Sequence, residues 1–387
     1  MFWKLQEDIL DQDDIGYLVD FIKTTKRFTQ FTKVREFEEV WSKWQGCKYS
    51  VYVNSGSSAN LILISAMKEL YGWRDNDEVI VPTVTWVTNI SPVMQMGLKP
   101  VFVDINPLNF SFDFDQLKER ITDRTKAIFV THLLGFPSGI EGIKKAVAER
   151  DIKILEDCCE SHGAHIDGVK IGNFGVGSTF SFYWGHHMTT VEGGMICTER
   201  EDLYNLCVLK RSHGLARELP QKHHDAYRKQ YPDIDFNFLF LTDGFNFRNT
   251  ELHAALGITQ ITKLDGYIKI RNKNFSDFLR ICDKYDDVLD ILQPPEGMSS
   301  FSLPFIFKSK EMKRRFQAEL AGNRIESRPI ISGNLLNQPF LRAYKNTCKA
   351  TSAELVDKNG FYIGNNQFVN SEKLDALEDI MKKFFGR

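Results

Sequence analysis

Two adjacent histidines, His186 and His187, lie between an aromatic run and a glycine-rich turn in the segment SFYWGHHMTTVEGGM. An imidazole has a pKa near 6.5, so either side chain could accept and return a proton at neutral pH. If the segment is extended, the two neighbours point to opposite sides. We therefore expect only one of them to face a substrate, and its role would be that of a general acid–base.

A second segment has the residue types of an anion site. NSGSSAN, residues 54–60, opens a predicted helix with small side chains. The backbone N–H groups of Gly56 and Ser57 could therefore face a phosphate, and the helix dipole favours negative charge there. The same turn could equally be a helix cap without a ligand. It matches neither a P-loop nor the G-x-G-x-x-G pattern of dinucleotide sites.

Three further residues follow strand-like runs. Asp157 ends the apolar run in ILEDCCESHGA, Trp86 follows the run in PTVTWVTN, and Ser181 begins SFY. A carboxylate at a strand end can pair with a protonated ring nitrogen, and a flat indole can stack on a heterocycle. Taken singly, the aspartate could be a helix cap and the tryptophan a core residue. Together with the anion site, they are the contacts that a phosphorylated pyridine ring needs.

The elements that must position these residues alternate along the chain. Runs rich in β-branched residues at 77–83, 99–106, 126–135 and 152–161 are separated by amphipathic helical patterns at 113–121 and 140–150. This alternation predicts an α/β fold, with a mainly parallel sheet and helices on both of its faces. A long helical pattern at 249–285 leads into a smaller α+β unit. We place the division between residues 1–264 and 265–387.

Composition excludes several classes of function. The 387 residues contain 49 Lys+Arg against 51 Asp+Glu, so nothing favours non-specific binding to nucleic acid or to an anionic membrane. No window approaches the roughly 18 apolar residues of a membrane span. The seven cysteines are scattered and lack metal-site spacing, so we expect neither a disulfide framework nor a metal. The sequence indicates a reduced, cytoplasmic protein that acts on a small molecule.

Several long motifs resemble one family in order along the chain: NSGSSAN, VPTVTWVTN, VFVDINP, LEDCCESHGA, FSFYWGHHMTTVEGGM, GFNFRNTELHAALG and ESRPI. They are similar to the DegT/DnrJ/EryC1/StrS sugar aminotransferases, which use pyridoxal 5'-phosphate on nucleotide-linked 4-keto sugars. The resemblance implies the aspartate-aminotransferase-like fold, with a large domain around a mainly parallel mixed sheet and a smaller C-terminal α+β domain.

One position departs from the aminotransferase pattern. The family carries its cofactor-binding lysine six residues before the glutamate of EGG, and here that position is His186. The chain therefore resembles the dehydratase branch, in which pyridoxamine 5'-phosphate and a histidine base remove the C3 hydroxyl of a 4-keto-6-deoxy sugar. The resemblance favours GDP-4-keto-6-deoxy-D-mannose as the substrate and L-glutamate as the donor that regenerates pyridoxamine phosphate. The same spacing selects His186 rather than His187 as the base.

The resemblance also assigns roles to residues of the site. It implies a homodimer with shared active sites. The implied contacts are Gly56, Ser57 and Ser181 at the phosphate, Asp157 at the ring nitrogen, Trp86 on the ring face, Glu160 on the ring-hydroxyl side, Asn246 at the phosphate of the neighbouring subunit, His213 at the sugar and Arg328 at a donor carboxylate or substrate phosphate.

Two alternatives stay open at this point. Lys170 or Lys210 could bind the cofactor covalently, which would make the chain an aminotransferase, or the chain could be a cofactor-binding regulator without activity. A related branch couples the same cofactor to an iron–sulfur cluster. That branch is disfavoured, because Cys207, Cys282 and Cys348 are too far apart in sequence for clustered ligands.

Overall fold

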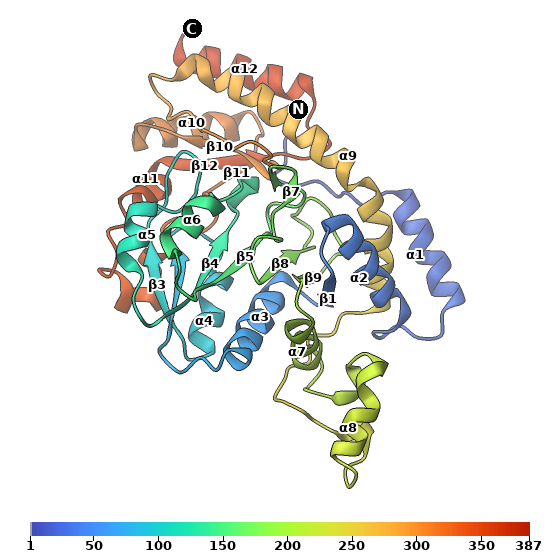
Figure 1. Ribbon diagram of the computed structural model, residues 1–387. Coiled ribbons are helices and arrows are strands. Elements are labelled where there is room, and N and C mark those ends of the chain that lie inside the picture. The colour runs from blue at the N-terminus through green and yellow to red at the C-terminus, as the bar shows by residue number, and fades with distance from the viewer. Residues whose placement is uncertain (1) are drawn as a thin grey trace.

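A seven-stranded mixed sheet forms the centre of the computed structural model, which describes residues 2–387 (Figure 1). Its strand order is β1-β9-β8-β5-β4-β2-β3. Strand β9 is antiparallel to both of its neighbours, and the pairs among β8, β5, β4, β2 and β3 are parallel. The strands are β1 (Tyr49–Val53), β2 (Glu78–Pro82), β3 (Lys99–Val103), β4 (Thr125–Thr131), β5 (Lys153–Asp157), β8 (Gly177–Ser181) and β9 (Gly194–Thr198). The predicted mainly parallel sheet is confirmed.

Both faces of this sheet are covered, as the alternation of strand and helix patterns predicted. Along β4, Ala127 and Phe129 belong to one core, whereas Ile128 and Val130 belong to another. Successive side chains of a strand point to opposite faces, so a strand buried on both sides shows no polar alternation. The α-helices up to residue 211 are α1 (Gln12–Thr24), α2 (Thr32–Gln45), α3 (Gly56–Leu70), α4 (Ser91–Gln95), α5 (Phe114–Arg120), α6 (Ile140–Val147) and α7 (Glu201–Arg211).

Helix α9 (Glu251–Cys282) links this sheet to a second, smaller one. Its first half contributes Ala254 and Leu264 to a core with α2, and its second half contributes Phe275 and Phe278 to the C-terminal core. The smaller unit contains β10 (Ser302–Ile306), β11 (Ser327–Arg328), β12 (Gly360–Gly364), α10 (Lys310–Gly322), α11 (Thr351–Asn359) and α12 (Ser371–Phe385). Its sheet is antiparallel, in the order β10-β12-β11. The division proposed at 264/265 falls inside α9 and stays a prediction.

The N-terminal segment packs against the C-terminal unit. Trp3 is buried in the same core as Phe305 and Phe361. Its backbone forms a parallel bridge with Ile325, and its indole N–H donates to the Gly364 carbonyl at 2.9 Å. The following residues are thereby held beside the C-terminal end of β12.

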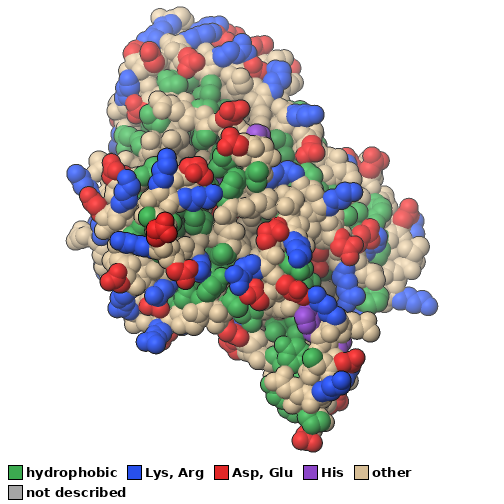
Figure 2. All heavy atoms as spheres, viewed as in Figure 1, with side chains coloured by type: hydrophobic (Ala, Val, Ile, Leu, Met, Phe, Trp, Pro, Cys, Tyr) green, Lys and Arg blue, Asp and Glu red, His purple; other side chains and the backbone are tan. Residues whose placement is uncertain are grey.

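An arm extends from the body between α7 and α9, at the bottom of Figure 1. It contains α8 (His224–Gln230), and it exposes Ile234, Phe238 and Phe240. Figure 2 shows acidic and basic side chains intermingled over the visible face, without a large area of one sign. A short hairpin, β6 (His165–Ile166) and β7 (Val169–Lys170), completes the strands. Within residues 2–387, no helix combines the length and the apolar character needed to cross a membrane.

Candidate active site

A cavity of about 700 Å³ lies where β5 and β8 end and α3 begins. This is the edge of a parallel sheet at which ligands of α/β proteins usually bind. Eight of the ten residues expected at the site line it: Gly56, Ser57, Trp86, Asp157, Glu160, Ser181, His186 and Arg328. The strand order and the start of α3 bring them together from positions that are far apart in sequence.

The start of α3 has the form of an anion cradle. Ser55 caps the helix by accepting the N–H of Ser58 at 3.1 Å, which leaves the earlier N–H groups without an intrahelical acceptor. At Gly56, an added Cβ would lie only 2.6 Å from the Cβ of Ser181. At Gly194, the second glycine of EGG, it would lie 2.3 Å from the Ser55 carbonyl oxygen. These glycines therefore let the start of α3 approach β8 and β9. As a result, the free N–H groups of the helix and the hydroxyl of Ser181 lie together at the cavity.

The side chain of Asp157 lines the cavity and is held there by three hydrogen bonds. The side-chain amides of Asn60 and Asn89 each donate to its Oδ2 at 2.9 Å, and the N–H of Cys159 donates to Oδ1. The hydroxyl of Thr179 donates to the amide oxygen of Asn60, and that of Thr85 donates to the amide oxygen of Asn89. These bonds turn the NH₂ end of each amide toward the aspartate. An ionised carboxylate in this position fits a protonated ring nitrogen.

The two adjacent histidines have different surroundings. His186 lines the cavity. Its backbone N–H donates to the Tyr183 carbonyl at 3.0 Å, and this hydrogen bond closes a turn. His187 is fully buried, and its Nε2 lies 3.3 Å from the Ser299 carbonyl oxygen. Burial, with a contribution from the Arg271 charge, lowers the pKa of His186 to about 3. At neutral pH His186 is therefore uncharged, which is the state required of a base, and its Nδ1 has no partner within residues 2–387.

The carboxyl group of Glu160 has a raised pKa. Burial raises the pKa of Glu160 to about 8, and the negative charge of Asp157 adds to this shift. The Leu134 N–H, which donates to Glu160 at 2.9 Å, and the Arg328 charge reduce the shift. At neutral pH Glu160 is therefore mostly protonated, so it can donate a hydrogen bond into the cavity. Trp86 is 48% exposed at the cavity edge, which leaves an indole face free for stacking.

Two expected site residues do not reach this cavity within one chain. Asn246 forms a bridge with Ser212, and its side-chain oxygen accepts a hydrogen bond from Arg248 Nε at 3.1 Å. The backbone N–H of His213 donates to the Phe245 carbonyl at 2.7 Å. The roles assigned to Asn246 and His213 therefore require the site of a second chain, and they stay predictions.

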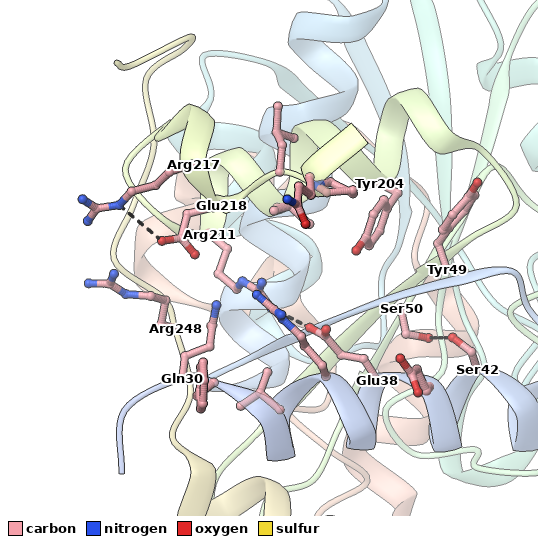
Figure 3. Close-up of a pocket in the computed structure, with 18 of the residues that line it drawn as sticks. Gln30, Glu38, Ser42, Tyr49, Ser50, Tyr204, Arg211, Arg217, Glu218 and Arg248 are labelled. Carbon is pink, nitrogen blue, oxygen red and sulfur yellow. Dashed lines mark hydrogen bonds and ion pairs between the residues drawn. The ribbon is translucent and has the colours of Figure 1, made fainter. Parts of the chain in front are cut away.

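Arg248 lines a second cavity of about 1080 Å³, between α2, α7 and the base of the arm (Figure 3). In Figure 3 the guanidinium of Arg211 is directed at Glu38, with the two groups 2.6 Å apart. The rings of Tyr49 and Tyr204 stack 4.8 Å apart. None of the ten expected residues lines this larger cavity.

The lysines considered as alternatives are engaged elsewhere. Lys210 is buried and pairs with Glu69 and Asp243 at 2.7 Å each. The Nζ of Lys170 lies over the ring of Trp44 at 4.2 Å. Among residues 2–387, Lys4 is the lysine that lines the smaller cavity, and it pairs with Glu7 at 3.0 Å.

Sequence reasoning missed the N-terminal contribution to the cavity. Besides Lys4, the segment supplies Leu5, Gln6 and Asp8, and Asp8 accepts a hydrogen bond from the Trp184 indole at 2.7 Å. No motif marks this segment. The amides of Asn60 and Asn89 were also missed, although both end motifs that had been singled out.

One buried trio could hold a metal by distance alone: the donor atoms of His132, Glu156 and Cys158 lie within 4.8 Å of one another. Glu156 already accepts hydrogen bonds from three backbone N–H groups of the 172–175 turn and contacts His132 Nε2 at 3.1 Å. The other ring nitrogen of His132 accepts the N–H of Ser138. His132 and Glu156 therefore already form a satisfied hydrogen-bond network, and Cys158 is buried beside them.

The site combines an anion cradle at a helix start, a carboxylate for a ring nitrogen and a free indole face. These features lie on an α/β fold with a large and a small sheet. Together they define a pyridoxal-phosphate enzyme of the aminotransferase fold. The sequence model of the DegT/DnrJ/EryC1/StrS aminotransferase family matches residues 9–379. The chain belongs to this family, as its motifs predicted.

Similar proteins include dehydratases of this family. The chain is 38% identical over 380 residues to the GDP-4-keto-6-deoxy-D-mannose 3-dehydratase of Escherichia coli, covering 96% of this chain and 97% of that protein. It is also 38% identical to the same enzyme of Yersinia pseudotuberculosis, covering 92% of each chain. A crystal structure of GDP-4-keto-6-deoxymannose-3-dehydratase with a trapped PLP-glutamate geminal diamine has a TM-score of 0.91 at 35% identity. It covers 98% of this chain and 100% of the other.

Proposed function

We propose that the chain catalyses the C3 dehydration of GDP-4-keto-6-deoxy-D-mannose, with pyridoxal and pyridoxamine phosphate as cofactor and L-glutamate as amino donor. The product is a 4-keto-3,6-dideoxy sugar. The observation that carries this proposal is His186, an uncharged imidazole on the cavity surface at the position where the family's aminotransferases have a lysine. Similarity over the whole chain to two dehydratases of this name supports the choice of substrate.

The chain's own residues account for binding and proton transfer. When bound, the cofactor supplies an electron sink for the carbons next to its amine. Gly56, Ser57 and Ser181 would hold its phosphate, and Asp157 would face its ring nitrogen. The amine of the cofactor would replace the C4 oxygen of the sugar, which leaves as water. His186 would accept a proton in the elimination and deliver it to the departing C3 oxygen, which leaves as a second water. Hydrolysis of the carbon–nitrogen bond at C4 would then restore the keto group and release ammonia, and glutamate would supply a new amine to the cofactor.

The direct test is a substrate panel. The protein is incubated with GDP-, CDP- and dTDP-linked 4-keto-6-deoxy sugars and glutamate, and the products are analysed by mass spectrometry. We expect loss of the C3 oxygen, fastest with the GDP-linked mannose derivative. A product that keeps this oxygen and gains an amine would show an aminotransferase instead.

A second test addresses the lysine alternatives. Borohydride reduction followed by peptide mapping should leave Lys4, Lys170 and Lys210 unlabelled by the cofactor. A labelled lysine peptide would contradict the proposed role of His186. Glutamate should also change the visible spectrum as the cofactor gains its amine, whereas a purified protein that binds no cofactor would favour a regulator.

The proposed assembly is a homodimer in which each active site receives Asn246 and His213 from the neighbouring subunit. The arm supports this assembly, because Phe238 and Phe240 are 64% and 57% exposed in one chain. All seven cysteines are free thiols, which suits the reducing cytoplasm.

A further inference from the structure

A buried guanidinium lies behind the His186 turn. Arg271, on α9, has no exposed surface. Its Nη1 donates to the carbonyls of Phe301, at 3.0 Å, and Asn365, and its Nη2 donates to the carbonyl of His186 at 3.4 Å. Each partner of this guanidinium within residues 2–387 is a backbone carbonyl rather than a carboxylate. An unpaired buried charge is costly, so an apolar side chain would fill the same space at lower cost.

The three carbonyls belong to three different segments of the chain. His186 follows β8, Phe301 precedes β10, and Asn365 follows β12. The Asn365 side chain donates back to the Arg271 carbonyl and to Ser300 Oγ, both at 2.9 Å, so the contact is reciprocal. At its other end the His186 turn is closed by the hydrogen bond to Tyr183. The backbone of His186 is thus fixed on both sides, between the large sheet and the small one.

We infer that Arg271 is a positioning residue that holds the His186 imidazole in place for proton transfer. Its guanidinium bridges the backbone carbonyl of His186 and the carbonyls of Phe301 and Asn365 in the smaller unit. The inference rests on the proposed function, because it concerns the base of that reaction. Misplacement of a catalytic group by about 1 Å can cost about 10²-fold in rate. A five-donor planar cation can bind three carbonyls at once, whereas a lysine ammonium of similar charge cannot match this geometry.

The charge of Arg271 has a second effect on the same base. Burial and this charge together lower the pKa of His186 and of its neighbours His162 and His187. The other titratable groups that face His186 across the cavity are Lys4, Asp8, Asp157, Cys159, Glu160, Tyr183, Glu192, Glu326, Arg328 and Tyr362. Arg271 is a buried cation whose charge acts on the base, and its removal should make His186 easier to protonate.

The test compares Arg271→Lys and Arg271→Met in the cofactor-loaded protein, with Arg280→Lys as the control. Arg280 lies on the same helix but is exposed and paired with Asp277. We expect Arg271→Lys to lower kcat about 10- to 100-fold, with KM for the GDP-linked sugar nearly unchanged and His186 still uncharged. We expect Arg271→Met to lower kcat as well, and to raise the pH at which His186 protonates. The control should match the wild type.

His186 protonation is followed by NMR of protein labelled at histidine, with the signal assigned by its loss in His186→Asn. This readout does not depend on turnover, so it remains decisive if the panel of sugars shows that the proposed reaction is wrong. The inference is overturned if folded Arg271→Lys keeps the wild-type kcat. It is also overturned if Arg271→Met leaves the His186 titration unchanged. If Arg271→Met does not fold, the kcat of Arg271→Lys decides alone.

Discussion

His186 and His187 are adjacent in sequence, but their side chains lie in different surroundings. We expected them to diverge because neighbours in an extended segment point to opposite sides. The structure separates them in a different way: residues 183–186 form a turn, closed by the hydrogen bond from the backbone N–H of His186 to the Tyr183 carbonyl, and the chain bends on through residue 188. His186 faces the cavity, and His187 is enclosed near Ser299 and Phe301. The family spacing to EGG selected the same residue, whereas the assumed backbone conformation was wrong.

The substitution His186→Lys should replace the proposed base with an amine that binds the cofactor covalently. A lysine amine at the cavity surface can react with the cofactor aldehyde, so we expect a new visible absorption band that borohydride removes. Dehydration should fall about 10²- to 10⁴-fold, because a positioned general base is lost. Absorption spectra and initial rates check both effects.

The matched control is His187→Gln, which keeps a polar side chain in the buried position. We expect no new absorption band and a rate close to that of the wild type. If His187→Gln instead abolishes dehydration in a folded protein while His186→Asn keeps full activity, the base has been assigned to the wrong histidine.

Glu160 should make stability depend on pH. Its pKa of about 8 lies above the ordinary value of 4.5, so between these values the folded form holds a proton that the unfolded form releases. The free energy of unfolding therefore falls as pH rises through this range. Substitution Glu160→Gln removes the titration. The apparent Tm of the variant relative to the wild type should rise from pH 5 to pH 8, whereas the exposed Glu119→Gln should give the same difference at both.

At the scale of elements, the sheet and the cavity edge were predictable for a common reason. The β-branched runs are long enough to mark buried strands, and parallel strands end at one edge, so Asp157 and Ser181 had to lie near the start of α3. The N-terminal segment was not predictable in this way. Its position depends on the pairing of Trp3 with Ile325 near the other end of the chain, and no local pattern encodes that contact. The orientation of Asn60 toward Asp157 likewise depends on Thr179, in another strand.

Replacing either of two glycines of α9 with alanine should change the stability of the protein, in opposite directions at the two positions. At Gly257 an added Cβ would lie 2.6 Å from the ring of Phe37, which is fixed by edge contacts with Tyr52 and Phe182. Gly257→Ala should therefore destabilise the protein by about 1–3 kcal/mol through overpacking. At Gly266 the space is open, so Gly266→Ala should stabilise it by about 0.5–1 kcal/mol through helix propensity. Denaturant unfolding measures both, and a stabilising Gly257→Ala would contradict the packing described.

At the scale of the whole molecule, the proposed sharing of active sites makes a quantitative prediction. His186→Asn chains would lack the proposed base, and Asn246→Ala chains would lack the phosphate contact proposed for the neighbouring site. In a hybrid dimer one site carries both defects and the other carries none. After unfolding and refolding an equal mixture, half of the dimers are hybrids, so about one quarter of the wild-type activity should return. Each variant refolded alone is the control, and a mixture no more active than their average would argue against sharing.

The antiparallel strand β9 also has a consequence for synthesis on the ribosome. Strand β1 is the first strand to be made and lies at the sheet edge, where its neighbour is β9. At about 5–20 residues per second, β1 waits roughly 7–30 s for that neighbour to be synthesised. We expect the tyrosines of β1 to be cleaved by chymotrypsin in ribosome-bound chains exposing residues 1–190, and protected once residues 1–240 have emerged. Equal protection at both lengths would mean that the nascent chain covers this edge with another segment first.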